Sequence, residues 1–199
     1  MTRTVQIDEA VNANVKRSKT VDLDVAPSGS FGAVPVALGA TAVASEAGDA
    51  VIHQTTITLT ALAQSIADAT SWASTKIYGF PTGRIIILGC KASLAPTTTS
   101  TIASTIKSGV AGAVALGSVA TDSIALTGTE VDLAPSTVTA NSTTINVAAA
   151  AVAPALAASA QFAGPLSMYL NSSVAAADID GDGTLTWSGT VKVTWINLG

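Results

Sequence analysis

The chain has 199 residues, which allows one well-buried domain but hardly two independent cores. Hydrophobic residues make up 48% of it and charged residues only 11%. Thr, Ser and Gly therefore have to form much of the solvent-exposed surface. The net charge of -4 and the pI near 4.7 argue against a nucleic-acid partner, because a phosphate backbone would be repelled.

The apolar composition does not predict a membrane protein. The most apolar stretch, residues 147–158, is interrupted by Pro154 and is shorter than the about 20 residues that a spanning helix needs. The first residues are polar and carry both charge signs, so we expect no membrane partner, and synthesis and assembly in the cytosol. Cys90 is the only cysteine, which excludes an intramolecular disulfide and fits a reducing compartment.

The N-terminal part of the chain has a composition of its own. Residues 1–24 are rich in charge, and residues 26–50 are rich in Gly, Ser, Ala and Pro without the period of a helix or a strand. We interpret residues 1–50 as an extended N-terminal arm or irregular leader that orders against the main domain, a neighbouring subunit or another partner. A frayed terminus is the alternative. The main domain is then expected to span residues 51–199.

From residue 51 onward the apolar residues recur with period two. Residues 57–61 alternate apolar and hydroxyl side chains, as a half-buried strand does. Residues 84–89 form a continuous, mostly β-branched run after the turn signal at 80–83, which indicates a strand buried on both faces. Residues 165–170 alternate again, with Leu166, Met168 and Leu170 on one side.

The C-terminal segment has the clearest pattern, because five large apolar residues share one parity: Leu185, Trp187, Val191, Val193 and Trp195. It predicts a strand over residues 184–196 with one inward face, in which Gly189 marks a bend or the close approach of another backbone. Helical periodicity is weak, and residues 62–72 and 148–158 each allow a turn or two. The predicted fold class is therefore all-β: an antiparallel β-sandwich or jelly-roll-like domain.

The sequence contains few groups that catalysis requires. His53 is the only histidine, so the usual nucleophile relays would have to be built on it. Cys90 follows directly on a predicted strand and is expected to be a small core residue. There is no glycine-rich phosphate loop, and the Cys and His count excludes a zinc site of several such ligands. We therefore expect no catalytic residue, no cofactor and no enzyme activity.

One motif suggests a metal. Asp178, Asp180 and Asp182 stand at positions one, three and five of an EF-hand-like loop, with a glycine at position six. Position twelve, where a bidentate Glu should complete the calcium shell, is Gly189, and a strand pattern follows instead of a helix. We favour a polar hairpin turn, since Asp and Gly tolerate the backbone angles of such turns, and keep a calcium site as the alternative.

Three segments, residues 51–61, 77–88 and 168–198, resemble small virion proteins of tailed bacteriophages. Within them, FPTGRIIILG at residues 80–89 is similar to a strand-start motif of that family, and LTWSGTVKVTW at residues 185–195 is similar to its closing motif. The resemblance extends over about the last three quarters of the chain and brings no catalytic or ligand-binding residue with it. It implies a head-stabilising capsid decoration, or cement, protein on the virion surface. Such a protein bridges capsomers, has the major capsid protein as its partner and is often a homotrimer.

A tail or head-fibre adhesion module that binds host glycan is the alternative virion role. Such a module needs an exposed aromatic platform or a completed acidic site. Two of the three tryptophans, Trp187 and Trp195, lie on the predicted inward face of the last strand. This placement favours the capsid-surface role over the adhesion role.

Overall fold

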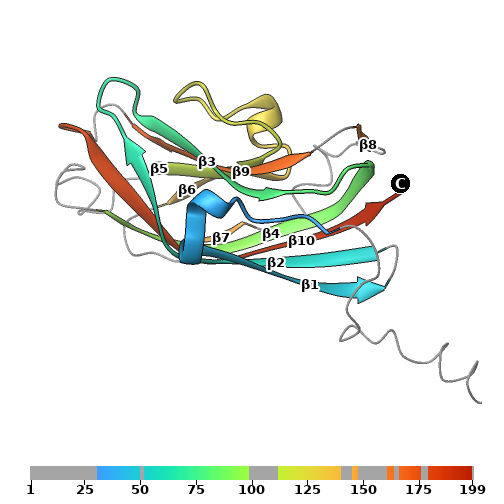
Figure 1. The fold of residues 1–199 in the computed structure, drawn as a ribbon. Helices are drawn as coiled ribbons and strands as arrows, with labels where there is room; N and C mark the ends of the chain where they lie inside the picture. The colour runs from blue at the N-terminus through green and yellow to red at the C-terminus, as the bar shows by residue number, and fades with distance from the viewer. Residues whose placement is uncertain are drawn as a thin grey trace, which may run out of the picture.

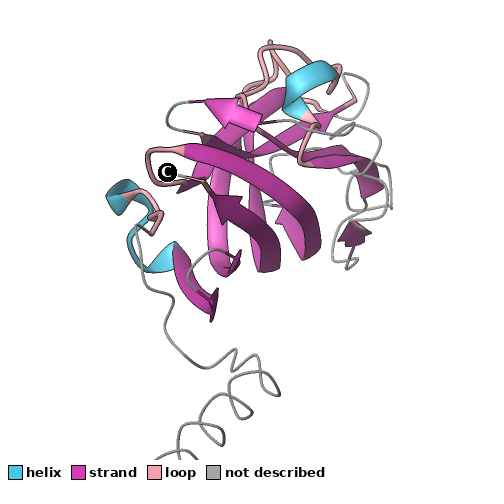
Figure 2. Ribbon diagram, turned by 90° about the vertical axis from the view of Figure 1, so that its right-hand side faces the viewer, coloured by secondary structure: helices cyan, strands magenta, loops and turns pink. Residues whose placement is uncertain are grey.

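The computed structural model describes residues 31–49, 52–98, 112–139, 145–147, 161–163, 166–175 and 179–198. Within these ranges the strands form two antiparallel sheets that pack face to face (Figures 1 and 2). The predicted all-β antiparallel sandwich is confirmed. No helix in the described part of the chain is long and apolar enough to cross a membrane.

The larger sheet has the order β1-β2-β10-β4-β7, with β8 also paired to β4. Its strands are β1 (Ala42–Asp49), β2 (Ile52–Ile66), β10 (Gly183–Asn197), β4 (Arg84–Thr98), β7 (Ile145–Val147) and β8 (Gln161–Ala163). The smaller sheet has the order β3-β9-β5-β6 and lies above the larger one in Figure 1. Its strands are β3 (Trp72–Gly79), β9 (Ser167–Val174), β5 (Gly112–Gly117) and β6 (Ala134–Thr139). Two short 3-10 helices, η1 (Val36–Thr41) and η2 (Gly128–Glu130), complete the described elements.

The core lies between the two sheets, and the C-terminal strand supplies much of it. The inward residues of β10 are those that the parity predicted, and all five are buried. Gly189 interrupts the row with a φ of 136°, and a Cβ placed there would lie 2.1 Å from the backbone oxygen of Ser93 on β4. The predicted close approach of another backbone at Gly189 is therefore confirmed.

The long central strand β2 changes parity at a β-bulge. Leu59 lies opposite Gly189, whereas Leu62 lies opposite Trp187, so two residues of β2 face one residue of β10. Ala61 takes a φ of 51° at this point, and its N–H donates to the hydroxyl oxygen of Ser188 over 3.1 Å. The bulge keeps both halves of β2 directed into the core.

The structure corrects two expectations for the strands. The strand that begins at Arg84 is not buried on both faces, because Ile85 and Ile87 are buried whereas Leu88 is 52% exposed. Among the residues that the structure describes, only one face of the larger sheet is covered, and a register shift against β10 leaves Leu88 in a bulge on the other face. In the segment 62–72, residues 62–66 continue β2, and only residues 67–71 form a turn, in which the N–H of Ser71 donates to the carbonyl oxygen of Ala67 over 2.8 Å. Residues 148–158 lie outside the described residues.

The N-terminal boundary also differs from the expected one at residue 50. Residues 42–49 form β1, which pairs along β2 from Ala42 opposite Leu59 to Asp49 opposite Ile52. Ala33 exchanges two backbone hydrogen bonds of 2.8 Å with Gly79 of β3, so residues 31–49 join both sheets. The small inward residues Ala42, Ala44 and Gly48 give β1 too weak an apolar period to be recognised. The arm expected over residues 1–30 lies outside the described residues.

Candidate functional site

The only histidine lies in the core, not in an exposed catalytic position. His53 points inward from β2 and is 1% exposed. Its ring stacks on Trp195 of β10, with centroids 4.0 Å apart, and Phe31 meets it edge-on at 6.1 Å. Its Nδ1 lies 3.4 Å from Oε2 of Glu46 on β1, and neither atom has another polar partner. The pair is close enough for an ion pair when the imidazole is protonated, but substrate cannot reach it.

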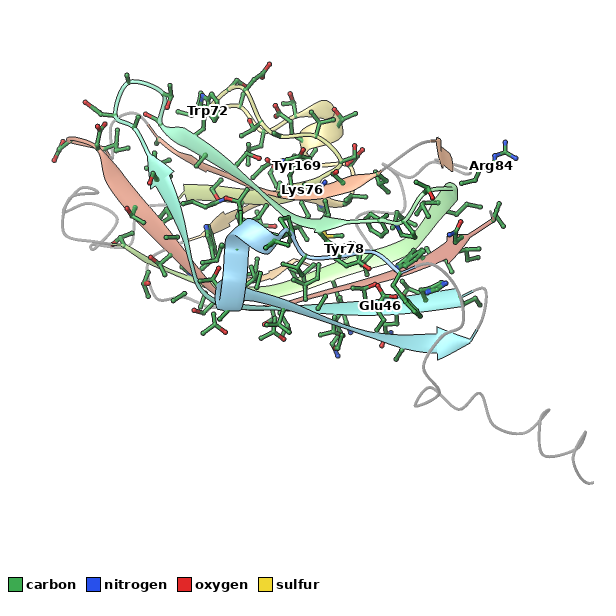
Figure 3. All side chains as sticks on the ribbon, viewed as in Figure 1. Glu46, Trp72, Lys76, Tyr78, Arg84 and Tyr169 are labelled. Atoms are coloured by element: carbon green, nitrogen blue, oxygen red, sulfur yellow. The ribbon has the colours of Figure 1, made fainter. Side chains whose placement is uncertain are left out.

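The carboxylate of Glu46 is the centre of a hydrogen-bond cluster that joins the two sheets. Its Oε1 accepts hydrogen bonds from the hydroxyl of Tyr78 on β3 and, over 3.2 Å, from that of Thr55 on β2. Thr55 in turn accepts the indole N–H of Trp195 at 2.8 Å. Figure 3 shows Glu46 and Tyr78 reaching toward each other from different sheets.

Burial, reinforced by the hydrogen bond to Glu46, raises the pKa of Tyr78 well above its usual value. Tyr78 is therefore held as a neutral donor to the carboxylate. The Thr55 hydroxyl is not available as a nucleophile in this cluster, because it donates one hydrogen bond to Glu46 and accepts another from Trp195. The arrangement is suited to holding β1, β2, β3 and β10 together.

A second buried cluster is centred on Gln64 of β2. Its amide N–H groups donate to Thr75 Oγ1 at 3.0 Å and to the carbonyl of Leu170 at 2.8 Å, both in the smaller sheet. Its carbonyl oxygen accepts the hydroxyl of Ser172 at 2.6 Å and the indole N–H of Trp187 at 2.8 Å. Gln64 is thus fully hydrogen-bonded across the sandwich, and both core tryptophans have buried acceptors.

A third cluster fixes the loop that covers part of the smaller sheet's outer face. Asn171 of β9 accepts the hydroxyl of Ser74 at 2.6 Å and the N–H of Thr121 at 3.1 Å. Its amide donates to the carbonyls of Val119 and Glu130 at 3.0 and 2.8 Å. The loop with η2, above the smaller sheet in Figure 1, is therefore attached by hydrogen bonds at several points.

Two carboxylates of this loop, those of Glu130 and Asp132, accept hydrogen bonds from the loop itself. Glu130 accepts backbone N–H groups of Asp122 at 3.3 Å and Thr127 at 3.0 Å. Asp132 accepts the N–H of Ser118 at 2.7 Å and its hydroxyl at 2.6 Å. Burial raises the pKa of Asp132 even though the bonds from Ser118 favour its charged form. These carboxylates shape the loop.

The EF-hand-like segment is only partly described. Asp178 lies outside the described residues, and Asp180 is exposed. Asp182 accepts the N–H of Asp68 at 2.9 Å, which ties the start of β10 to the turn after β2. Within the described ranges no three His, Cys, Asp or Glu side chains come together as metal ligands. The contact of Asp182 is the kind that a polar turn uses.

Cys90 lies in the core, as expected of a small apolar residue, and is a free thiol. Burial raises the pKa of this thiol to about 12. The reactive thiolate is therefore disfavoured, and the residue is chemically inert in the folded protein.

The outer face of the larger sheet, defined as the side of β1, β2, β10 and β4 that points away from the smaller sheet, has a different character. It is dominated by hydroxyl side chains, among them Thr56, Thr58, Thr186, Thr190 and Thr194. The sequence parity places these residues outward. It does not reveal that Lys192 lies directly opposite Lys91, because strand register brings distant segments together.

Comparison of the chain with models of known protein families, with curated proteins and with solved structures finds no match.

Proposed function

We propose that the chain is a non-enzymatic structural protein of a tailed-bacteriophage virion, located on the capsid surface, that stabilises the shell by bridging capsomers. The observation that carries the proposal is the division of polar groups between interior and surface. The only histidine and the core polar side chains of Glu46, Gln64 and Asn171 serve contacts within the fold. The outer face of the larger sheet, by contrast, has no described strand or helix packed against it.

The strand order further supports the family resemblance. We infer a jelly-roll winding, because β2, β10, β4 and β7 are neighbours in one sheet and β3, β9, β5 and β6 are neighbours in the other. The connections from β2 to β3, from β3 to β4 and from β4 to β5 each cross between the sheets. A closed sandwich of this kind is a compact, stiff module that exposes one broad sheet face.

In the proposed role the mechanism is mechanical. The polar clusters on Glu46 and Gln64 hold the two sheets in one relative position, so load applied to one sheet is transmitted to the other. Contacts with the major capsid protein, repeated over a lattice and combined with trimeric self-association, raise the strength of attachment beyond that of a single contact. The host-glycan alternative has less support, because the indoles of Trp187 and Trp195 are buried and hydrogen-bonded.

The experiment is binding of the purified chain to mature capsids of the phage that encodes it, measured by co-sedimentation over a range of concentrations. Saturable binding at a fixed number of copies per capsomer is expected. A chain that remains in the supernatant at micromolar concentration would refute the proposed role.

The arm hypothesis is tested in the same assay with a chain that lacks residues 1–30. This deletion leaves β1 in place, whereas a deletion through residue 50 removes it. The proposed arm contact predicts lower capsid occupancy with an unchanged melting temperature. Full occupancy would exclude a role of the arm in attachment.

A further inference from the structure

The outer face of the larger sheet carries a row of aliphatic side chains at one end. Ile196 of β10 lies opposite Ile52 of β2 and Ile86 of β4 in the strand register, so the three residues form one row across the sheet. Ile52 is 49% exposed, and Leu88, in the adjacent bulge of β4, is 52% exposed. Ile86 and Ile196 are half-buried between them. Single exposed apolar residues are ordinary, but here apolar side chains of three neighbouring strands lie side by side on one face, which suits an interaction surface.

Two lysines lie beside this row. Lys192 of β10 and Lys91 of β4 are directly opposite each other, and both are exposed. Cβ atoms of such pairs are about 5 Å apart, and like charges in this position destabilise a sheet. The neighbouring positions of the face carry neutral, polar Thr, Ser and Gln. The exposed face is therefore hydrated without the charged pair.

A hollow separates the lysine pair from the aliphatic row. It has a volume of about 230 Å³ and is lined by Gln54, Gly89, Cys90, Lys91, Lys192 and Thr194. Gly89, Thr194 and Gln54 lie in one cross-strand row, between the lysines on one side and the isoleucines on the other. The hollow exists because Gly89 has no side chain to fill this position of the row.

The lysine pair has no acidic counterpart among the described side chains of this face. Glu46 points into the core, and the carboxylates of Asp68, Asp122, Asp180 and Asp182 are in turns and loops outside the four strands. Neither Lys91 nor Lys192 forms an ion pair with a described carboxylate. The described side chains around the lysine pair on β2, β10 and β4 are thus basic or neutral, on a chain whose net charge is -4.

We propose that Ile52, Ile86, Leu88, Ile196, Lys91 and Lys192 form the docking patch of this protein, and that its partner is a protein surface of acidic and aliphatic side chains. In naming that surface as the outside of the capsid shell, the inference rests on the proposed function. The aliphatic row supplies the apolar centre of the contact, and the lysines supply the charged rim that selects and steers an acidic partner.

Two other occupants fit the patch less well. A nucleic acid offers phosphates to the lysines but nothing to the aliphatic row, and the overall charge of the chain repels it. A second copy bound through the same patch brings two lysine pairs to one interface, where like charges oppose association. A protein surface with acidic and aliphatic side chains is the occupant that can contact both the lysine pair and the aliphatic row.

The test compares two charge-reversed variants in the capsid co-sedimentation assay. K91E/K192E inverts the charge of the patch, and K76E changes the exposed lysine of β3 in the other sheet as the matched control. We expect K91E/K192E to bind at least about tenfold more weakly, K76E to bind as the wild type does, and the wild-type affinity to fall with added salt. K91Q/K192Q should lose less affinity and should fold at least as stably as the wild type, because it removes a like-charge pair.

The outcomes separate the patch from the proposed function. Capsid binding that is equal for the wild type and both double variants overturns the patch and leaves the proposed function standing. Equal losses for K76E and K91E/K192E also overturn it, because the effect is then one of net charge. A wild-type chain that does not bind capsids overturns the proposed function, and the docking inference with it. Lysine-dependent binding to a DNA duplex instead of capsids overturns the choice of partner.

Hydrogen exchange on the bound wild-type chain gives a readout without mutation. Slower exchange at residues 52–56, 86–92 and 190–196 is expected on the capsid. Unchanged exchange in all three segments of a bound chain would place the contact elsewhere.

Discussion

Replacement of Gln64 by leucine tests whether the two sheets depend on the buried polar cluster. The substitution keeps a similar volume but removes the acceptor of two buried donors, the indole N–H of Trp187 and the hydroxyl of Ser172. A buried donor without an acceptor costs about 1 to 3 kcal/mol, so Q64L should lose about 2 to 6 kcal/mol of unfolding free energy. For a chain of this size that lowers Tm by at least about 4 °C.

The matched control is Gln54→Leu, which lies on the same strand but on the outer face, where its side chain is exposed. Chemical denaturation of wild type, Q64L and Q54L, with calorimetry for Tm, gives the comparison. Q54L should change the unfolding free energy by less than about 0.5 kcal/mol, as surface substitutions usually do. Equal stability of Q64L and Q54L would refute the view that the cluster on Gln64 joins the sheets.

Three further predictions concern the backbone, pH and calcium. Gly189→Ala should cost more than about 2 kcal/mol in denaturation, because the added Cβ meets a β4 carbonyl oxygen at 2.1 Å, whereas G181A, which meets open space, should leave stability nearly unchanged. The raised pKa of Tyr78 means that its stabilisation is complete below pH 10 and is lost as pH rises further. Wild-type stability relative to Y78F should therefore fall above pH 10, and a constant difference in alkaline melting curves would contradict this. Because Asp182 serves the turn before β10, millimolar calcium should leave Tm unchanged, and a rise of several degrees would restore the calcium site.

The fold class and the inward face of β10 could be predicted because large apolar residues alternate there over a whole strand. The open face of β4 could not, since residues 85–88 are all large and apolar and have no period that shows which side is covered. The strand β1 was missed because its inward positions hold small residues such as Ala42 and Gly48. A hairpin signal did exist, since Gly48 and Asp49 precede the alternating residues of β2.

The candidate site was less predictable than the fold. His53 was singled out, but its stacking on Trp195 and its approach to Glu46 follow from register over long sequence distances. Glu46 and His53 flank the β1–β2 hairpin, and this spacing was the one local sign that they meet. The opposition of Lys91 and Lys192 has no such sign, because 100 residues lie between them in the chain.

A cryo-EM reconstruction of capsids incubated with the purified chain tests the proposed capsid-surface role. We expect two-sheet density at fixed lattice positions, with the outer face of the larger sheet turned toward the shell. Capsids whose surface lattice shows no added density at saturating chain concentration would contradict it.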